Sequence, residues 1–424
     1  QNCAEIGRKP HGRAPASGEC RAKVPIRPPV VCGQMKSDSG RRVSSLQTTM
    51  FLICSQEVFS LQLDNLGLTY TKQEDYSMKM NELGRSGIMI SDLCLGTMTY
   101  GTQTDQADAF AQMDMAVEVG INIFDTAEMY PVNPITAETQ GDSERMVGDW
   151  FRASGKRNQV VLATKHSGMG IKHIRDRAPI TASSIPEAID GSLKRLQTDV
   201  IDLYQFHWPN RGSYMFRQNW NYDPSKQNKA ETIQHMHDCL GALQTEVSRG
   251  RIRAFGLSNE SAWGTARWLR ASEEGHGPRV ASIQNEYSLM CRMYDTDLAE
   301  LSVNEDVGLL AFSPLATGLL SGKYANNAVP EGSRMSMSPE LGGRNTARAH
   351  LAAAAYMQVA QKHGLDPVHM ALAWCAGRPF MASVIFGATT AAQLAHIIAG
   401  KDIELSDQVL ADLNKTHRAH PMPY

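Results

Sequence analysis

From Met80 onward, short runs of apolar and β-branched residues alternate with longer segments in which apolar residues recur at helical spacing. The short runs are apolar on both faces, which is typical of strands buried in a parallel sheet. Because parallel strands are joined by helices, the alternation indicates an α/β protein. We predict eight strands, at Leu93–Thr97, Ile121–Asp125, Val160–Lys165, Ile201–His207, Arg253–Ser258, Ser282–Asn285, Gly308–Ser313 and Ser383–Gly387.

The segments between these runs carry helix signals. Gln106–Val119 and Glu144–Ala153 are amphipathic, and Pro186 opens a third helix. Thr232–Ser248 forms a fourth, which Gly250 stops. Eight strands alternating with helices favour a (β/α)8 TIM barrel. The alternative, a doubly wound open sheet, would carry a glycine-rich phosphate loop after its first strand, and the segment LCLGTMTYG has too few glycines for one.

Residues 1–77 differ in character from the remainder. Residues 1–43 contain nine Lys and Arg against three acidic residues, with few apolar residues and no strand or helix period. Such a composition buries too little apolar surface to offset the entropy of ordering, so we predict a disordered basic extension over 1–77. A small hairpin turning at Gly84 and Gly87 then begins the barrel, which covers 78–424. Two interpretations of the extension stay open: a transit peptide, or sequence upstream of a natural start at Met78 or Met80.

Composition and charge exclude several classes of protein. The formal net charge is -2 and no basic face dominates, so we expect no nucleic-acid partner. No apolar run approaches the roughly 20 residues of a membrane span, so we expect no membrane partner. The eight cysteines form no CxxC pair, which predicts reduced thiols and no metal site. The oligomeric state does not follow from these features.

Functional residues of a (β/α)8 barrel lie at the carboxyl ends of its strands. Asp125, Lys165 and His207 end three successive predicted strands, and Tyr130 follows Asp125 closely. We therefore expect the four side chains to converge at one mouth of the barrel. Each of them alone is more often structural than functional, because most buried polar groups only satisfy hydrogen bonds.

Together, these four residue types suit acid catalysis on a carbonyl group. A phenol is a weak acid at neutral pH, and a nearby ammonium such as that of Lys165 acts to lower the pKa of Tyr130. Asp125 can hold Lys165 in place as a buried partner. His207 can orient the oxygen of the substrate by a hydrogen bond.

The chain resembles the aldo-keto reductase superfamily in the segments INIFDTAEMYP, LATKHSG, SLKRLQTDVIDLYQFHWP, IRAFGLSNE and SIQNEYSLM. It is similar to the Tas-type NADP(H)-dependent branch in LGTMTYGTQTDQADAFAQMDMAVEVGINIFDTAEMYPV and IFGATTAAQL. The resemblance covers about residues 78–423 and not the first 77. It implies that the catalytic tetrad is Asp125, Tyr130, Lys165 and His207.

The resemblance also implies that NADPH, or NADP+, binds extended across the barrel mouth without a Rossmann motif. Its implied binding residues fall into five groups: Ser258, Asn259 and Gln284 at the carboxamide; Phe312 against the nicotinamide ring; Ser313, Pro314, Leu315, Gly318 and Lys323 around the pyrophosphate; Arg334 at the adenosine 2′-phosphate; and Gly387, Thr389 and Gln393 at the last phosphate and adenine contacts. One position departs from the pattern, because Ile397 stands where the family often has an asparagine that contacts adenine.

The implied activity is NADPH-dependent reduction of an aldehyde or ketone to an alcohol, with Tyr130 as the general acid. The alternative is a redox-sensing regulatory subunit that binds NADPH and turns over slowly. For the small-molecule carbonyl substrate we expect a pocket that includes Trp208, which adjoins His207, and Tyr100. The expected compartment is the cytoplasm, or a plastid or mitochondrion if the extension is a transit peptide.

Overall fold

The structure is a computed structural model that describes residues 49–54, 57–64, 67–72 and 78–424. The chain divides into two units, Gln1–Glu74 and Asp75–Tyr424. In the first unit, β1 (Thr49–Cys54), β2 (Glu57–Asp64) and β3 (Gly67–Lys72) form an antiparallel sheet in that order. These strands fall within the segment predicted to be disordered, and the rest of that segment lies outside the described residues. Residues 49–72 contain β-branched and aromatic residues, which favour strands. The prediction of disorder rested on the basic composition of residues 1–43 and did not take these residues into account.

The second unit is built on a closed barrel of parallel strands, which confirms the predicted (β/α)8 fold. Neighbours in the barrel follow the chain order, and the last strand pairs with the first. The observed strand boundaries coincide with the predicted ones or differ from them by one or two residues. The strands are β6 (Leu93–Gly96), β7 (Ile123–Asp125), β8 (Val161–His166), β9 (Ile201–Phe206), β10 (Ile252–Ser258), β11 (Val280–Glu286), β12 (Gly308–Phe312) and β13 (Met381–Phe386).

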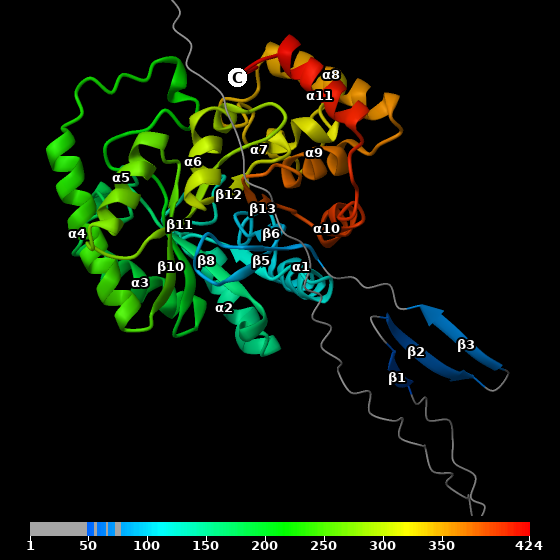
Figure 1. Cartoon of the computed structure of the whole chain (residues 1–424). Coiled ribbons are helices and arrows are strands. Elements are labelled where there is room, and N and C mark those ends of the chain that lie inside the picture. Colours follow the sequence, from blue (N-terminus) through cyan, green and yellow to red (C-terminus); the bar gives the residue numbers. More distant parts are fainter. Residues whose placement is uncertain (1–48, 55–56, 65–66, 73–77) are drawn as a thin grey trace, which may run out of the picture. The chain divides into compact units, whose positions relative to one another are not determined.

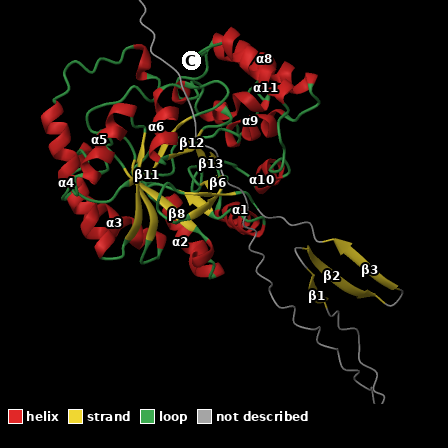
Figure 2. Ribbon diagram, in the orientation of Figure 1, coloured by secondary structure: helices red, strands yellow, loops and turns green. Residues whose placement is uncertain are grey.

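Helices surround this barrel in the second unit, as Figures 1 and 2 show. They are α1 (Gln106–Glu118), α2 (Asp142–Ser154), α3 (Ser184–Leu196), α4 (Lys229–Ser248), α5 (Ala262–Glu273), α6 (Asp297–Glu305), α7 (Arg334–Met337), α8 (Ala347–Lys362), α9 (Pro367–Ala376), α10 (Ala391–Ile398) and α11 (Asp407–Ala419). Helix α4 begins earlier than predicted because the side chain of Asn228 accepts from the amides of Ala230 and Glu231 and caps it. None of the helices in the described ranges is both long and apolar enough to cross a membrane.

A hairpin of β4 (Met80–Glu82) and β5 (Met89–Ser91) precedes the barrel, as predicted. Its turn contains Gly84, whose φ of 59° belongs to the left-handed region that glycine tolerates. A Cβ atom on Gly84 would lie 2.5 Å from the carbonyl oxygen of Ala281, at the start of β11. The hairpin therefore closes the amino-terminal end of the barrel and leaves the carboxyl end as the mouth.

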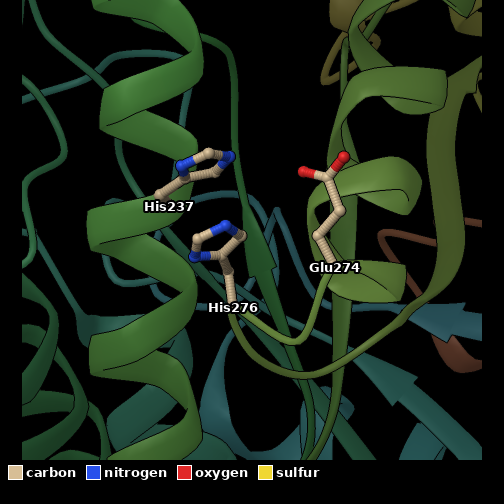
Figure 3. Close-up of side chains that lie close together, drawn as sticks. All are labelled: His237, Glu274 and His276. Carbon is tan, nitrogen blue, oxygen red and sulfur yellow. The ribbon is translucent and has the colours of Figure 1, made fainter.

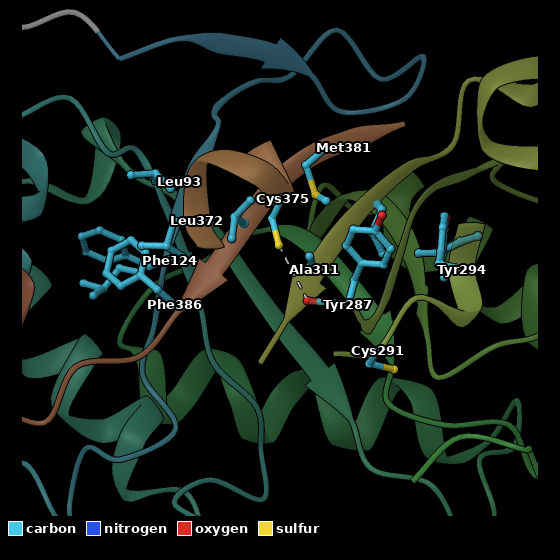
Figure 4. Close-up of a cluster of buried hydrophobic side chains, with 14 of the residues drawn as sticks. Leu93, Phe124, Tyr287, Cys291, Tyr294, Ala311, Leu372, Cys375, Met381 and Phe386 are labelled. Carbon is cyan, nitrogen blue, oxygen red and sulfur yellow. Dashed lines mark hydrogen bonds between the residues drawn. The ribbon is translucent and has the colours of Figure 1, made fainter. Parts of the chain in front are cut away.

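The apolar core has two main parts. Inside the barrel, aliphatic side chains such as Ile123, Ala163 and Leu203 pack with Ile90 of the hairpin. Between strands and helices lies a larger aromatic-rich layer, part of which Figure 4 shows around Tyr287. The cysteines of residues 78–424, Cys94, Cys239, Cys291 and Cys375, are buried and unpaired. Burial raises the pKa of Cys239 to about 12, which makes a reactive thiolate there unfavourable.

Candidate active site

The four side chains predicted at the barrel mouth lie together. Asp125 ends β7, Lys165 lies in β8, His207 directly follows β9, and Tyr130 lies in the loop after β7. Lys165 Nζ donates to Asp125 Oδ2 at 2.6 Å and to the carbonyl oxygen of Thr126 at 2.7 Å. It also lies 3.4 Å from the hydroxyl of Tyr130. The ammonium is therefore held between a carboxylate and the phenol, with no exposed surface.

The phenol of Tyr130 is nearly enclosed, since only 9% of the residue is exposed. Its ring packs edge-on against the imidazole of His207, with ring centroids 5.7 Å apart. Burial raises the pKa of Tyr130, and the ammonium of Lys165 acts against that rise. Lys165 thus acts to lower the pKa of Tyr130, as expected, but the effect of burial is larger. Tyr130 is therefore protonated at neutral pH and able to donate a proton.

The ammonium of Lys165 stays charged inside the protein. Burial acts to lower the pKa of Lys165, and the neighbouring Asp125 carboxylate and Tyr130 oxygen outweigh that effect, so the pKa is raised. A permanently charged ammonium beside the phenol stabilises the phenolate that remains once the proton has left.

His207 is a neutral imidazole. Burial, with a further contribution from the charge of Lys165, holds its pKa well below the usual value. Its Nδ1 is buried and has no hydrogen-bond partner among the described residues. Asn259 Nδ2 donates to the carbonyl oxygen of His207 at 2.9 Å and so fixes the backbone of His207. A neutral ring with an unused nitrogen is suited to a hydrogen bond with a bound molecule.

A network of amide side chains extends from the tetrad. Gln284 Nε2 donates to Asp125 Oδ1 at 2.8 Å and to Gln205 Oε1 at 3.1 Å. Gln205 in turn donates to the same oxygen of Asp125 at 3.3 Å. Gln205 was not predicted, although it lies two residues before His207 on one strand and therefore faces the same side. Asn259 Nδ2 donates to Ser258 Oγ at 3.1 Å, and its Oδ1 atom is buried without a partner in residues 78–424.

Several residues of the loop after β12 have left-handed backbone conformations. Ser313, Ala316, Thr317 and Gly318 all have positive φ values, between 47° and 98°. The amides of Ala316 and Gly318 already donate to the carbonyl oxygens of Ser313 and Leu315, at 2.8 Å and 2.9 Å, so only other amides of this turn could meet an anion. Phe312 ends β12 half-buried, and Lys323 is exposed at the far end of the loop. Pro314 and Leu315 lie within the same turn, so the predicted group is contiguous in space.

Arg334 opens helix α7, and its charge acts to lower the pKa of Tyr130. Burial, with repulsion from Arg344, lowers the pKa of Arg334 to about 10. Its Nε is buried without a partner in the described part of the chain. Nearby, Glu286 binds both Arg344, at 2.7 Å, and Arg217, at 3.0 Å. Two guanidinium groups thus share one carboxylate, and both repel the nearby charge of Arg334, so positive charge is in excess here.

The predicted residues after β13 lie at its carboxyl end. Gly387 is exposed, and a Cβ atom there would contact nothing within 4 Å. The amide and hydroxyl of Thr389 both donate to Gln393 Oε1, at 3.0 Å and 3.1 Å. Ile397, by contrast, is buried in the core, with 4% of its surface exposed. The isoleucine therefore contributes to packing and offers no polar contact at the surface.

The two expected pocket aromatics differ in placement. Trp208 packs against His207, with ring centroids 4.9 Å apart, and belongs to a small cluster around Tyr130. Tyr100 is fully buried, and its hydroxyl donates to Gln112 of helix α1 at 3.2 Å. A side chain without exposed surface cannot meet a substrate, so the structure does not support Tyr100 as a pocket residue. Its position near a strand end was not enough to predict which way the ring points.

A buried ion pair that the sequence did not predict anchors the wall of the mouth. Arg175, in the loop after β8, binds both oxygens of Glu128 at 2.9 Å and 2.6 Å. Glu128 also accepts from the amide of Ser167 at 2.6 Å. The pair joins the loop after β7, which carries Tyr130, to the loop after β8.

Comparison with known proteins agrees with this geometry. Residues 92–418 match the aldo/keto reductase family. The chain is 42% identical to Protein tas of Escherichia coli over 352 residues, which is 82% of this chain and 99% of that protein. It is 31% identical to the uncharacterized oxidoreductase YrpG of Bacillus subtilis, over 80% of this chain and 95% of that protein. It is 28% identical to a probable voltage-gated potassium channel subunit beta of Arabidopsis thaliana, over 77% and 92% of the respective chains. This chain is an oxidoreductase that belongs to the aldo/keto reductase family.

Proposed function

We propose that this protein reduces an aldehyde or ketone to an alcohol with NADPH, and that Tyr130 donates the proton. The observation that carries the proposal is the contact between Lys165 Nζ and the Tyr130 hydroxyl, with Asp125 behind the lysine and His207 beside the phenol. Reduction of a carbonyl needs an acid at the oxygen while hydride reaches the carbon.

Each of the four residues at the mouth has a separate role in proton transfer. The substrate oxygen is expected to sit between the Tyr130 hydroxyl and the neutral ring of His207. His207 orients that oxygen, and Tyr130 transfers its proton to it as negative charge develops. Lys165 stabilises the resulting phenolate, and Asp125 keeps Lys165 in reach. Because the site is buried, these electrostatic effects are stronger than in water.

The residues around the mouth fit a nicotinamide dinucleotide phosphate. The unpaired Oδ1 of Asn259 suits the amide of a carboxamide, and half-buried Phe312 suits a stacked ring. The turn from Ser313 to Gly318 and the excess of guanidinium groups suit phosphates. Gly387, Thr389 and Gln393 are assigned to the remaining phosphate and adenine contacts. When bound, NADPH supplies the hydride.

Replacing Arg334 tests the cofactor preference. We expect Arg334→Ala to raise the Kd of NADPH by about 10–100-fold, because a hydrogen bond to a charged group is worth about 1.5–3 kcal/mol. The Kd of NADH, which lacks the 2′-phosphate, should change far less. Fluorescence titration of both cofactors measures the difference. The control is Arg348→Ala, an exposed arginine whose guanidinium donates to the backbone of Pro421. An equal rise in the Kd of NADPH and of NADH would contradict a contact between Arg334 and the 2′-phosphate. It would indicate a contact with a group that both cofactors share, such as the pyrophosphate.

The pH profile of kcat/KM tests the proton donor. Burial raises the pKa of Tyr130 above its usual value, so the phenol is fully protonated at neutral pH. The proton donor is lost only when the pH rises through this raised pKa. His207 stays neutral because its pKa is well below normal. We expect a flat profile from about pH 7 to about pH 9 and a fall at higher pH. A limb near pH 7 would contradict the assignment of Tyr130.

A second candidate function is a redox-sensing subunit that binds NADPH and turns over slowly. The similarity to plant proteins named probable voltage-gated potassium channel subunit beta, from Arabidopsis thaliana and rice, favours it. NADPH oxidation with a panel of aldehydes, ketones and sugars separates the two. Turnover supports the reductase, whereas tight NADPH binding without turnover supports the sensor.

A further inference from the structure

Outside the barrel mouth, two imidazoles and a carboxylate meet on the helical layer. His237 projects from α4, and Glu274 and His276 lie at the end of α5 and just beyond it. Nitrogen and oxygen atoms from the three side chains all lie within 4.8 Å of one another. Figure 3 shows the rings of His237 and His276 face to face, with the carboxylate of Glu274 turned toward them. We propose that these three residues bind a divalent transition-metal ion such as Zn²⁺.

The ligand set has the chemistry of a zinc site. Neutral imidazole nitrogens and a carboxylate oxygen are ligands that zinc accepts, with water taking the fourth position. The two rings are stacked, with centroids 3.6 Å apart and planes 10° from parallel. Neither ring has a hydrogen bond to any residue in the described ranges. Their nitrogen lone pairs are therefore free to bind a cation.

Only small side-chain movements separate this arrangement from a coordinated ion. An ion shared by two imidazoles lies in the plane of both rings, so one ring has to turn out of the stack. His276 and Glu274 are exposed and can turn without opening the core. Glu274 Oε1 accepts from Arg270 Nε at 2.8 Å, which leaves Oε2 for the metal. One carboxylate oxygen is sufficient for a tetrahedral site.

The backbone brings the ligands together before any ion binds. The amide of His276 donates to the carbonyl oxygen of Ala271 at 3.1 Å, which ties the loop to the end of α5. Next in the chain is Gly277, where a Cβ atom would lie 2.2 Å from the carbonyl oxygen of Leu240. Only a glycine allows the loop to approach α4 so closely. The loop is thus held against α4, with His276 facing His237.

This loop leads into the amino end of β11, so the proposed site lies at the end of the barrel opposite to the mouth. An ion there would join α4 to the connection after α5. Because that end of such a barrel serves stability and the mouth serves chemistry, the expected role is structural. Sequence spacing predicted no metal site, because His237 lies on another helix, far along the chain from Glu274 and His276.

A second cluster of the same residue types provides a matched control. His369 and His396 are also stacked, and Asp366 lies beside them. Both carboxylate oxygens and one nitrogen of each ring are already used, since Asp366 caps α9 and pairs with His396, and His369 Nε2 donates to the carbonyl oxygen of His396 at 2.6 Å. Substitution in this cluster should leave zinc binding unchanged.

Zinc titration of the full chain tests the proposal. We expect the wild type to bind one more Zn²⁺ than His237→Asn or His276→Asn, and Glu274→Gln to weaken that site by about tenfold or more. Saturating Zn²⁺ should raise the Tm of the wild type and of His369→Asn, but not of the two histidine variants. All variants should share one Tm without metal, which excludes misfolding.

Cobalt spectroscopy identifies the ligands independently. Co²⁺ at this site should give visible bands of nitrogen and oxygen ligation without thiolate charge-transfer bands, and these bands should be absent in His276→Asn. Equal zinc stoichiometry and affinity in the wild type and both histidine variants would overturn the proposal. A cobalt spectrum with thiolate bands that survives His276→Asn would do so as well.

Discussion

Tyr130→Phe is expected to reduce kcat for carbonyl reduction by about 10²–10⁴-fold, the range that general acid catalysis contributes. The substitution removes only the hydroxyl, which lies 3.4 Å from Lys165 Nζ. The aromatic ring stays to pack against His207, so the Kd of NADPH should be nearly unchanged. Steady-state kinetics with a reactive aromatic aldehyde and a fluorescence titration of NADPH measure the two quantities.

Tyr294→Phe is the matched control for the loss of a buried phenolic hydroxyl. The hydroxyl of Tyr294 is buried and paired with Ser302 of α6, so it is not available to a substrate. We expect this variant to keep the wild-type kcat. Wild-type turnover in Tyr130→Phe would exclude Tyr130 as the proton donor, whatever the result for the control.

Lys165→Met is expected to reduce both activity and stability. The variant leaves Asp125 buried, with 4% of its side chain exposed, and without its cation. Removing one partner of a buried pair typically costs about 3–5 kcal/mol, because the remaining charge is desolvated without compensation. The remaining phenol also loses the charge that acts against the rise in its pKa, so the high-pH limb of kcat/KM should move further up. Urea denaturation and the pH profile measure these effects.

Lys156→Met offers an ion pair of the same length in a different environment. Lys156 Nζ lies 2.6 Å from Asp114, as Lys165 does from Asp125, but its side chain and that of Asp114 are 28% and 45% exposed. Solvent screens such a pair, so its loss should cost about 1 kcal/mol or less. Equal destabilisation by the two substitutions would show that burial does not control the strength of the Lys165 pair.

The barrel and the position of the tetrad were predictable from local patterns. Runs that are apolar on both faces, separated by helical periods, require a buried parallel sheet. The carboxyl ends of such strands meet at one mouth, so Asp125, Lys165 and His207 had to converge once the fold was known. The hairpin at Gly84 was predictable for the same reason, because glycine marks the turn directly.

Other features of the site depend on groups that no local pattern brings together. Whether the pKa of Tyr130 rises or falls depends on the balance between burial and one ammonium, and burial is set by every segment that covers the ring. Tyr100 lies near a strand end as the tetrad residues do, yet it points into the layer beneath α1. The bonds from Gln205 and Gln284 to Asp125 require three strands at a fixed register.

Side-chain alternation and helical spacing act between neighbours in the chain, so the order of residues alone specifies the strands, the helices and the edge at which Asp125, Lys165 and His207 gather. Desolvation, the direction of a ring and the meeting of His237 with His276 arise between segments far apart in the chain. These properties depend on distances of a few ångströms that exist only after the barrel has closed and the helices have packed around it.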